Sequence, residues 1–208
     1  MSNLIHGNQI SHRTTTCKVG DAVGVPNEEF WFVAIVNNNS EKKCVAQLSK
    51  MGYESFALIQ KETRTYSNGR KKNIDIILLP AMIFIRCSEE KRRKEIVTMP
   101  LIKRFLVNRA GEKNEFKRNP LAIIPDNQIE RLTRLLQDGP EKIIIEQDYF
   151  CVGEYVIVKE GSLKGLIGNI VQDNSGSSYI VVTIDNLGCA KMRINTESVE
   201  RYVESANP

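Results

Sequence analysis

A glycine-punctuated stretch near the C-terminal end, residues 153–172, constrains the fold of this chain more than any other feature. Val156 and Val158 are two residues apart, so their side chains lie on one face of a predicted strand. Gly161 and Gly165 then mark a turn, and a second apolar run covers residues 166–171. Glycine suits such positions because it adopts positive φ and lets another backbone approach closely. The stretch therefore predicts a tight β-hairpin within a small all-β unit.

The spacing in this stretch resembles the KOW motif, a short repeat that opens a small SH3-like barrel in ribosomal proteins and in NusG-type transcription factors. Generic glycine-rich hairpins share parts of the pattern, so the rest of the chain decides which class of protein this is. The residues that carry the resemblance are Gly153, Val156, Val158, Gly161, Gly165 and Gly168.

Length, composition and cysteine usage are those of an ordinary globular protein. The chain has 208 residues, of which 41% are hydrophobic and 26% charged. No apolar run approaches the roughly 18 residues of a membrane helix, and the N-terminus lacks the layout of a signal peptide. Five scattered cysteines without a CxxC pair favour a reducing compartment over a disulfide framework or a zinc site. We expect a cytoplasmic protein without a membrane segment, a metal or another cofactor.

Positive charge is concentrated in the first two thirds of the chain. Residues 30–139 hold 21 Lys or Arg against 12 Asp or Glu, whereas residues 151–208 hold 5 against 7. This asymmetry predicts that only the first part contacts a polyanion, the alternative being a solvated basic surface.

Residues 1–28 read as a polar leader, and order begins with an aromatic and β-branched strand at residues 30–36. Asn38 is expected to cap a helix, with Glu41 as its reciprocal partner and Cys44, Leu48 and Met51 as its apolar stripe. Further strands are expected at 53–65, 74–79, 82–86 and 103–107, with a turn at Asn68-Gly69, and helices from Ser88 to about 97 and from Pro125-Asp126 onwards.

This order predicts an α+β sandwich, an antiparallel sheet flanked by helices, followed by an all-β SH3-like barrel. Gly139-Pro140 opens a charge-mixed join, although three consecutive isoleucines make it less polar than a free linker. The expected organisation is a leader at 1–28, a first domain at 29–139, a linker at 140–150 and a second domain at 151–205.

Taken together, the two halves resemble the NusG family, in which an NGN domain precedes a KOW domain. Trp31-Phe32-Val33 resembles the opening strand of the family, and residues 78–85 resemble its strand with a proline after two large apolar residues. Phe105 and Ile124-Pro125-Asp126 match the tail of the NGN domain. The resemblance covers residues 30–203 and implies an α+β NGN domain joined to a KOW barrel.

Two departures indicate a specialised paralogue of the RfaH or UpxY type. Ala81 and Met82 replace the usual residues after the proline, and residues 186–189 replace the usual Phe-Gly of a barrel loop. The implied function is transcription elongation or antitermination on particular operons, such as capsule or other long operons. The alternatives are a housekeeping NusG-type elongation or termination factor and a ribosome- or RNA-binding KOW protein.

The resemblance implies that the NGN domain binds the clamp helices of RNA polymerase through an apolar depression. By position in the motif, the candidate contacts are Leu79, Met82, Ile35 and Phe84. Strand alternation, however, places Leu79 with Ile83 and Ile85 on one face and Met82 with Phe84 on the other. Core packing is the alternative reading of these residues.

Basic groups of the first domain are candidates for contacts with non-template DNA or nascent RNA, mainly through phosphates. Residues 91–94 form one such group, and the candidates in the others are Gln47, Lys50, Arg64, Arg70, Lys71, Lys72, Lys103 and Arg104. The resemblance implies that the KOW domain binds a second protein and that the chain is a monomer. We expect no enzymatic activity, because the sequence has no phosphate-binding loop and no Cys with a plausible base partner.

Overall fold

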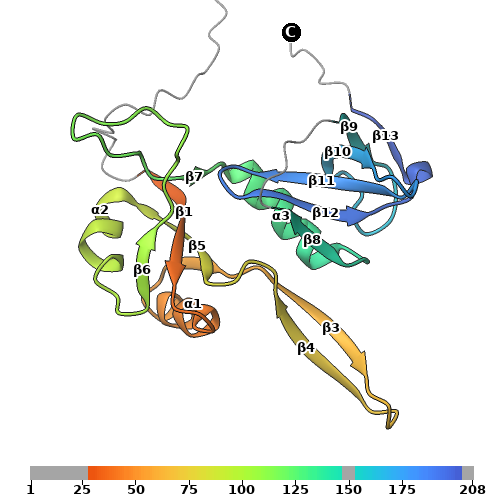
Figure 1. The fold of residues 1–208 in the computed structure, drawn as a ribbon, viewed down its shortest axis with the longest axis horizontal. Coiled ribbons are helices and arrows are strands. Elements are labelled where there is room, and N and C mark those ends of the chain that lie inside the picture. Colours follow the sequence, from red (N-terminus) through yellow and green to blue (C-terminus); the bar gives the residue numbers. More distant parts are fainter. Residues whose placement is uncertain (1–27, 147–152, 203–208) are drawn as a thin grey trace, which may run out of the picture.

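The structure, a computed structural model, describes residues 28–146 and 153–202, which form three antiparallel sheets and three α-helices (Figure 1). All of the predicted leader except Glu28, and residues 147–150 of the predicted linker, lie outside the described residues. This mixed fold of antiparallel sheets and few helices agrees with the prediction of antiparallel sheets combined with helices.

The first sheet is built around β1, the aromatic and β-branched strand. β5 pairs with one edge of β1, and β2 extends the sheet beyond β5. The other edge of β1 is shared, because β7 pairs with its first half and β6 with its second half. The strands are β1 (Glu29–Val36), β2 (Glu54–Phe56), β5 (Met82–Ser88), β6 (Ile102–Phe105) and β7 (Ile123–Ile124).

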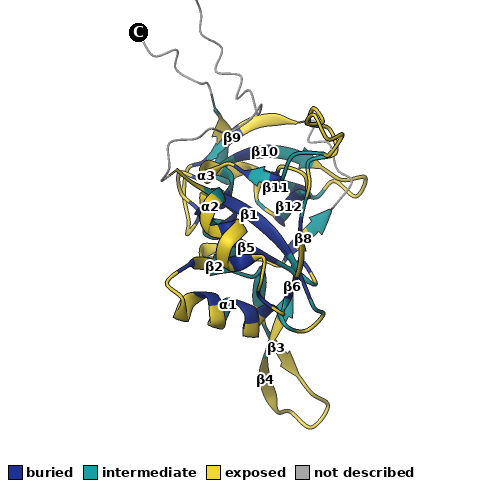
Figure 2. Cartoon of the chain, turned by 90° about the vertical axis from the view of Figure 1, so that its left-hand side faces the viewer, coloured by how far each residue is buried: buried dark blue, intermediate teal, exposed yellow. Residues whose placement is uncertain are grey.

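Helices cover the two faces of this sheet, and the alternation of β1 assigns its side chains to them (Figure 2). Phe32, Ala34 and Val36 pack with buried residues of α1 and η1, whereas Trp31 and Val33 pack in the cluster that includes α3. The helical elements are α1 (Glu41–Lys50), α2 (Glu89–Lys91), the π-helical turn η1 (Arg92–Ile96) and α3 (Asp126–Asp138).

The start of α1 differs from the prediction. Ser40, not Asn38, occupies the N-cap position, and its side chain makes no capping hydrogen bond. Glu41 is 1% exposed and accepts a hydrogen bond at 2.6 Å from the backbone N–H of Ala81. The carboxylate therefore ties the helix to the entry of β5. Met51, predicted in the apolar stripe, is 44% exposed because it follows the last helical residue.

The predicted strand over residues 53–65 is divided in two. β2 belongs to the first sheet, while β3 (Ile59–Thr65) pairs with β4 (Lys71–Ile77) in a separate two-stranded hairpin that extends away from the sheet (Figure 1). Leu58, fully buried, lies at the break and accepts a backbone hydrogen bond from Leu78. The predicted turn is confirmed, since Gly69 has φ +76° at the hairpin tip.

The predicted alternation across residues 79–85 is wrong at its first member. Leu79 packs in the same cluster as Phe84, while Ile83 and Ile85 pack in the opposite one. The chain turns between these segments, with Ala81 at φ +59°, so the two-residue period does not run through the turn.

The second sheet has six strands in the order β13-β9-β10-β11-β12-β8. β8 lies inside the interval expected to be a linker, and it pairs antiparallel with β12. The linker prediction is therefore wrong for residues 143–146, which form the edge strand of this sheet through backbone hydrogen bonds to β12. The strands are β8 (Ile143–Glu146), β9 (Glu154–Val158), β10 (Ile167–Gln172), β11 (Ser178–Ile184), β12 (Gly188–Arg193) and β13 (Val199–Arg201), with a short helix η2 (Thr196–Ser198) before the last.

Helix α3 packs between the two large sheets. Its residues Leu132 and Leu135 are fully buried in a cluster that also contains Ile180 and Met192 of the second sheet. Two hydrogen bonds join α3 to the second half of the chain. Gln128 accepts one from the backbone N–H of Asp185 at 2.8 Å, and the Arg134 side chain donates one at 2.7 Å to the Lys164 carbonyl. In addition, the Gln60 side chain of β3 donates to the Glu141 carbonyl and accepts from the backbone N–H of Ile143.

Candidate functional site

The four residues expected to contact polymerase lie on one face of the first sheet. In the antiparallel register of β1 and β5, Ile35 is opposite Met82 and Val33 is opposite Phe84. Residues directly opposite each other share a face, so Ile35, Met82 and Phe84 point to the same side. Leu79 precedes β5 and packs in the cluster that holds Phe84.

Burial divides these four residues into two pairs. Leu79 and Phe84 are 1% and 0% exposed, and Phe84 stacks on Phe56 with ring centroids 4.9 Å apart. Ile35 and Met82 lie at the end of the strand pair and are partly exposed. In this conformation, therefore, only the Ile35–Met82 pair offers side-chain atoms to a partner.

Arg104 extends this row onto the next strand. It pairs with Ile35 in the register of β6 and β1, so a cation lies beside the partly exposed apolar pair. Lys103 lies in a β-bulge, because the register shifts between Ile35 and Val36. Both basic side chains are exposed. The arrangement of an apolar centre with a cationic rim fits a macromolecular contact.

Gln47 and Lys50 are exposed on α1, which covers the other face of the first sheet. The structure therefore does not bring these two residues together with Arg104. They form a separate surface on the solvent side of the helix.

The β3–β4 hairpin presents the third group of predicted nucleic-acid contacts. Arg64 is directly opposite Lys72, and Arg70 follows the turn at Gly69. Among the described residues, no ion pair involves Arg70, Lys71 or Lys72, whereas Arg64 lies 3.4 Å from Glu62. An ion pair of 2.5 Å between Lys42 and Asp75 anchors the hairpin to α1 and lowers the pKa of Asp75. The cations near the tip are thus free to contact phosphates.

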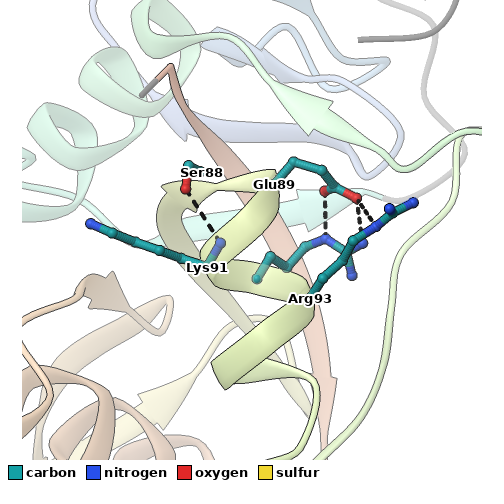
Figure 3. Close-up of polar contacts among 5 residues, drawn as sticks. Ser88, Glu89, Lys91 and Arg93 are labelled. Atoms are coloured by element: carbon teal, nitrogen blue, oxygen red, sulfur yellow. Dashed lines mark hydrogen bonds and ion pairs between the residues drawn. The ribbon is translucent and has the colours of Figure 1, made fainter. Parts of the chain in front are cut away.

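The basic group at residues 91–94 has partners of its own (Figure 3). Glu89 contacts Arg92 at 2.7 Å and Arg93 at 2.9 Å, and Glu90 contacts Lys94 at 2.6 Å. Arg92 is 8% exposed and lies over the ring of Phe105 at 4.9 Å. Lys91 lies 3.7 Å from Glu29 of β1. All four cations therefore have partners within the protein, which argues against a contact with nucleic acid.

Replacing Glu89 by glutamine is expected to lower the free energy of unfolding at pH 7. Burial alone raises the pKa of Glu89, but Arg92 and Arg93 outweigh burial and hold it below its usual 4.5. A charged hydrogen bond stabilises by about 1.5–3 kcal/mol; because the carboxylate side chain is 37% exposed, we expect a loss of about 1 kcal/mol after solvent screening.

The pH dependence of this loss follows from the sign of the shift. Because the folded pKa is depressed, the contribution is present above 4.5 and disappears as the pH falls through the folded value. Urea unfolding of wild type and Glu89→Gln across this range checks it. Glu90→Gln is the matched control, since Glu90 lies in the same turn and its side chain is 58% exposed. An equal effect of both variants would contradict the role of Arg92.

The residues expected to form the KOW motif occupy the β9–β10 hairpin. Val156 and Val158 are both buried, and Gly161 and Gly165 have φ +80° and +81° in the turn. Gly168 lies in a crowded part of the sheet, where an added Cβ would be 2.7 Å from the Val181 carbonyl oxygen. At Gly153 it would be 2.5 Å from the Ile170 carbonyl oxygen. Gly161 and Gly165 are therefore required for their positive φ, whereas Gly153 and Gly168 are required because a side chain would clash with a neighbouring backbone.

The described residues contain no group of three or more His, Cys, Asp and Glu placed to hold a metal ion. Burial raises the pKa of Cys44 to about 11 and that of Cys87 to about 12, so both remain thiols at neutral pH. His6 and His12 lie outside the described residues. No helix in the described ranges is long and apolar enough to cross a membrane.

One exposed segment, residues 107–121, has no counterpart among the predicted site residues. It carries Phe116, which is 79% exposed, among several basic side chains. It lies between the strand predicted at residues 103–107 and the helix predicted from Pro125-Asp126. The sequence feature that could have indicated a binding site here is an aromatic residue flanked by lysines and arginines.

A family model described as NusG, transcription termination factor nusG, matches residues 29–133, about half of the chain. No curated protein matches the chain. A solved structure titled "Domain interaction in Thermotoga maritima NusG" is 16% identical, with 84% of this chain and 97% of that chain covered and a TM-score of 0.41. A structure of an MjSpt4:Spt5 complex, conformation B, is 14% identical, with 85% and 99% covered and a TM-score of 0.26.

Proposed function

The chain belongs to the NusG family of transcription factors, and on that premise we propose that it binds the clamp helices of RNA polymerase and promotes processive transcription of particular operons. Residues 29–139 act as an NGN domain that makes this contact. Residues 151–205 act as a KOW domain, with β8 added to its sheet, and bind a second protein.

The observation that carries this proposal is the row formed by Arg104, Ile35 and Met82 across three adjacent strands. A partly exposed apolar pair supplies contact area that is buried on binding, and the adjacent cation steers association with an acidic partner. Leu79 and Phe84 support this pair from the interior, where they contact other core residues rather than the partner.

The nucleic-acid contacts belong to the same proposal. With polymerase held by the apolar row, the β3–β4 hairpin and the exposed face of α1 reach non-template DNA or nascent RNA. Arg70, Lys71 and Lys72 act through phosphates, which makes their contribution dependent on salt. Gln47, Lys50 and Lys103 add contacts at separate positions on the domain.

Capture of core RNA polymerase by the full chain tests the proposal. We expect wild type to retain polymerase and Met82→Asp to retain at least tenfold less, because a carboxylate at the centre of an apolar contact loses hydration on binding. Met51→Asp is the matched control, since Met51 is 44% exposed at the end of α1, on the other side of the sheet.

Circular dichroism of each variant verifies the fold before capture. Retention of polymerase by folded Met82→Asp would remove the apolar row from the interface. Capture of ribosomal RNA instead of polymerase by wild type would favour the ribosome-binding alternative.

A further inference from the structure

The segment at residues 107–121 forms an arm on the edge of the first sheet. It leaves after β6 and returns at β7, and both strands pair with the same edge of β1. An isolated bridge joins Val107 and Leu121, and the backbone N–H of Asn108 donates to the Pro120 carbonyl at 2.9 Å. Figure 1 shows the arm as the large green loop at the opposite end of the domain from the β3–β4 hairpin.

Hydrogen bonds fix the shape of the tip of this arm. The Asn114 side-chain oxygen accepts from the backbone N–H of Phe116 at 3.1 Å and of Arg118 at 3.0 Å, and the backbone N–H of Asn114 donates to the Arg118 carbonyl at 3.0 Å. Lys117 has φ +56°, a conformation that non-glycine residues rarely adopt. The turn therefore fixes the backbone around Phe116, whose side chain is 79% exposed.

Phe116 is the most exposed of the large hydrophobic side chains in the described ranges. Cations surround it in the sequence of the arm, at Arg109, Lys113, Lys117 and Arg118. No ion pair joins any of these four to another residue that the structure describes, although Glu112 and Glu115 lie in the same arm. The tip thus combines an open aromatic face with unpaired positive charge.

We propose that the arm at residues 107–121 binds single-stranded nucleic acid, with Phe116 stacked on a base and the arm's cations on the flanking phosphates. An exposed ring stacks on any unpaired base, and basic side chains hold the backbone beside it. A duplex hides its base faces within its own stack, so it does not offer this contact. Non-template DNA and nascent RNA share the required chemistry. The inference rests on the proposed function, which brings the chain to a polymerase that exposes both.

Binding of the full chain to labelled oligothymidylate and oligouridylate of about 15 nucleotides tests the inference without polymerase. Fluorescence anisotropy is measured for wild type, Phe116→Ala, Phe116→Leu and Phe116→Tyr. We expect Ala and Leu to bind about tenfold more weakly and Tyr to bind like wild type, because only an aromatic ring stacks. Val97→Ala is the control, since Val97 is 48% exposed at the end of η1.

A tryptophan at position 116 gives a direct readout of stacking. The natural chain has one tryptophan, Trp31, which is 4% exposed. In Phe116→Trp, a base that stacks on the new indole is expected to quench its emission, while the emission of wild type stays constant on titration with the same oligonucleotide. A salt titration separates the phosphate contacts, which weaken with salt, from the stacking contact.

Wild-type affinity in Phe116→Leu, or unchanged emission in Phe116→Trp at saturating oligonucleotide, would overturn the inference. Equal weakening of duplex and single-strand binding in Phe116→Leu would also overturn it, because a duplex offers phosphates but no free base face. Preference for one of the two oligonucleotides identifies the strand that is bound. Phe116→Ala is expected to retain polymerase in the capture experiment, so loss of oligonucleotide binding and loss of polymerase binding report separately on the two proposals.

Discussion

Replacing Leu79 by aspartate is expected to unfold the part of the chain that is built around the first sheet. The side chain is 1% exposed within the cluster that joins the first sheet, α3 and the second sheet. Removing a buried leucine costs about 2–5 kcal/mol, and a carboxylate without a partner in that place adds several more. The sum is on the order of the whole stability of a domain, about 5–15 kcal/mol. Thermal unfolding followed by circular dichroism measures the loss.

Met82→Asp is the control for Leu79→Asp, because it places the same carboxylate at a partly exposed position. Met82 lies on the same face but keeps part of its surface in water, so its carboxylate stays hydrated and the expected loss is about 1 kcal/mol. A folded Leu79→Asp with a melting temperature close to that of Met82→Asp would show that Leu79 is accessible in solution. Capture experiments with Leu79→Asp report on folding, whereas those with Met82→Asp report on the interface.

The second large effect is expected from steric crowding at Gly168. An added Cβ would lie 2.7 Å from the Val181 carbonyl oxygen and 3.0 Å from a side-chain carbon of Ile180. Because a backbone atom cannot move without disturbing the pairing of β10 and β11, we expect Gly168→Ala to cost about 2 kcal/mol and Gly168→Val about 3 kcal/mol. Urea unfolding of the full chain measures both losses.

Gly161 provides the contrasting case. Nothing lies within 4 Å of its Cβ position, but its φ of +80° strains any residue with a side chain. Gly161→Ala is expected to cost about 1 kcal/mol, and asparagine is expected to recover part of it because it tolerates this conformation. Asparagine at Gly168 should recover nothing. Equal recovery at both positions would show that conformation, rather than space, is what Gly168 provides.

Local signals predicted the elements whose determinants are local. The aromatic run around Trp31 forms the central strand, the turn at Gly69 has the expected positive φ, and Ser88 accepts the capping hydrogen bond from Lys91. The helical period over residues 126–138 predicts an apolar stripe of Ile129, Leu132, Leu135 and Leu136; the first three are buried, and Leu136 is half-buried. In each case a few residues close together in the sequence determine the local structure.

The predictions that failed depend on residues distant in the sequence. Glu41 bonds the backbone of Ala81 instead of capping its own helix, and no local pattern announces a partner 40 positions away. Leu79 changes face because the chain turns at Ala81, whose left-handed conformation its residue type does not predict. β8 becomes a strand through pairing with β12, which begins far along the chain.

The candidate interface was predictable in part. The register of β1 with β5 and β6 brings Ile35, Met82 and Arg104 into one row, as family position alone suggested for the first two. Burial then separates Leu79 and Phe84 from them, and burial depends on where α3 and the second sheet pack. The placement of Gln47 and Lys50 on the other side of the sheet also required the tertiary structure.

The pairing of β8 with β12 has a consequence during protein synthesis. Ile143, Ile144 and Ile145 leave the ribosome before their partner strand, which begins at Gly188, exists. At about 5–20 residues per second, this apolar edge waits for several seconds on a nascent chain. An unpaired, isoleucine-rich strand is a template for association with other chains. The second sheet therefore closes only after β12 has been synthesised, and until then β8 is a segment exposed to misassembly.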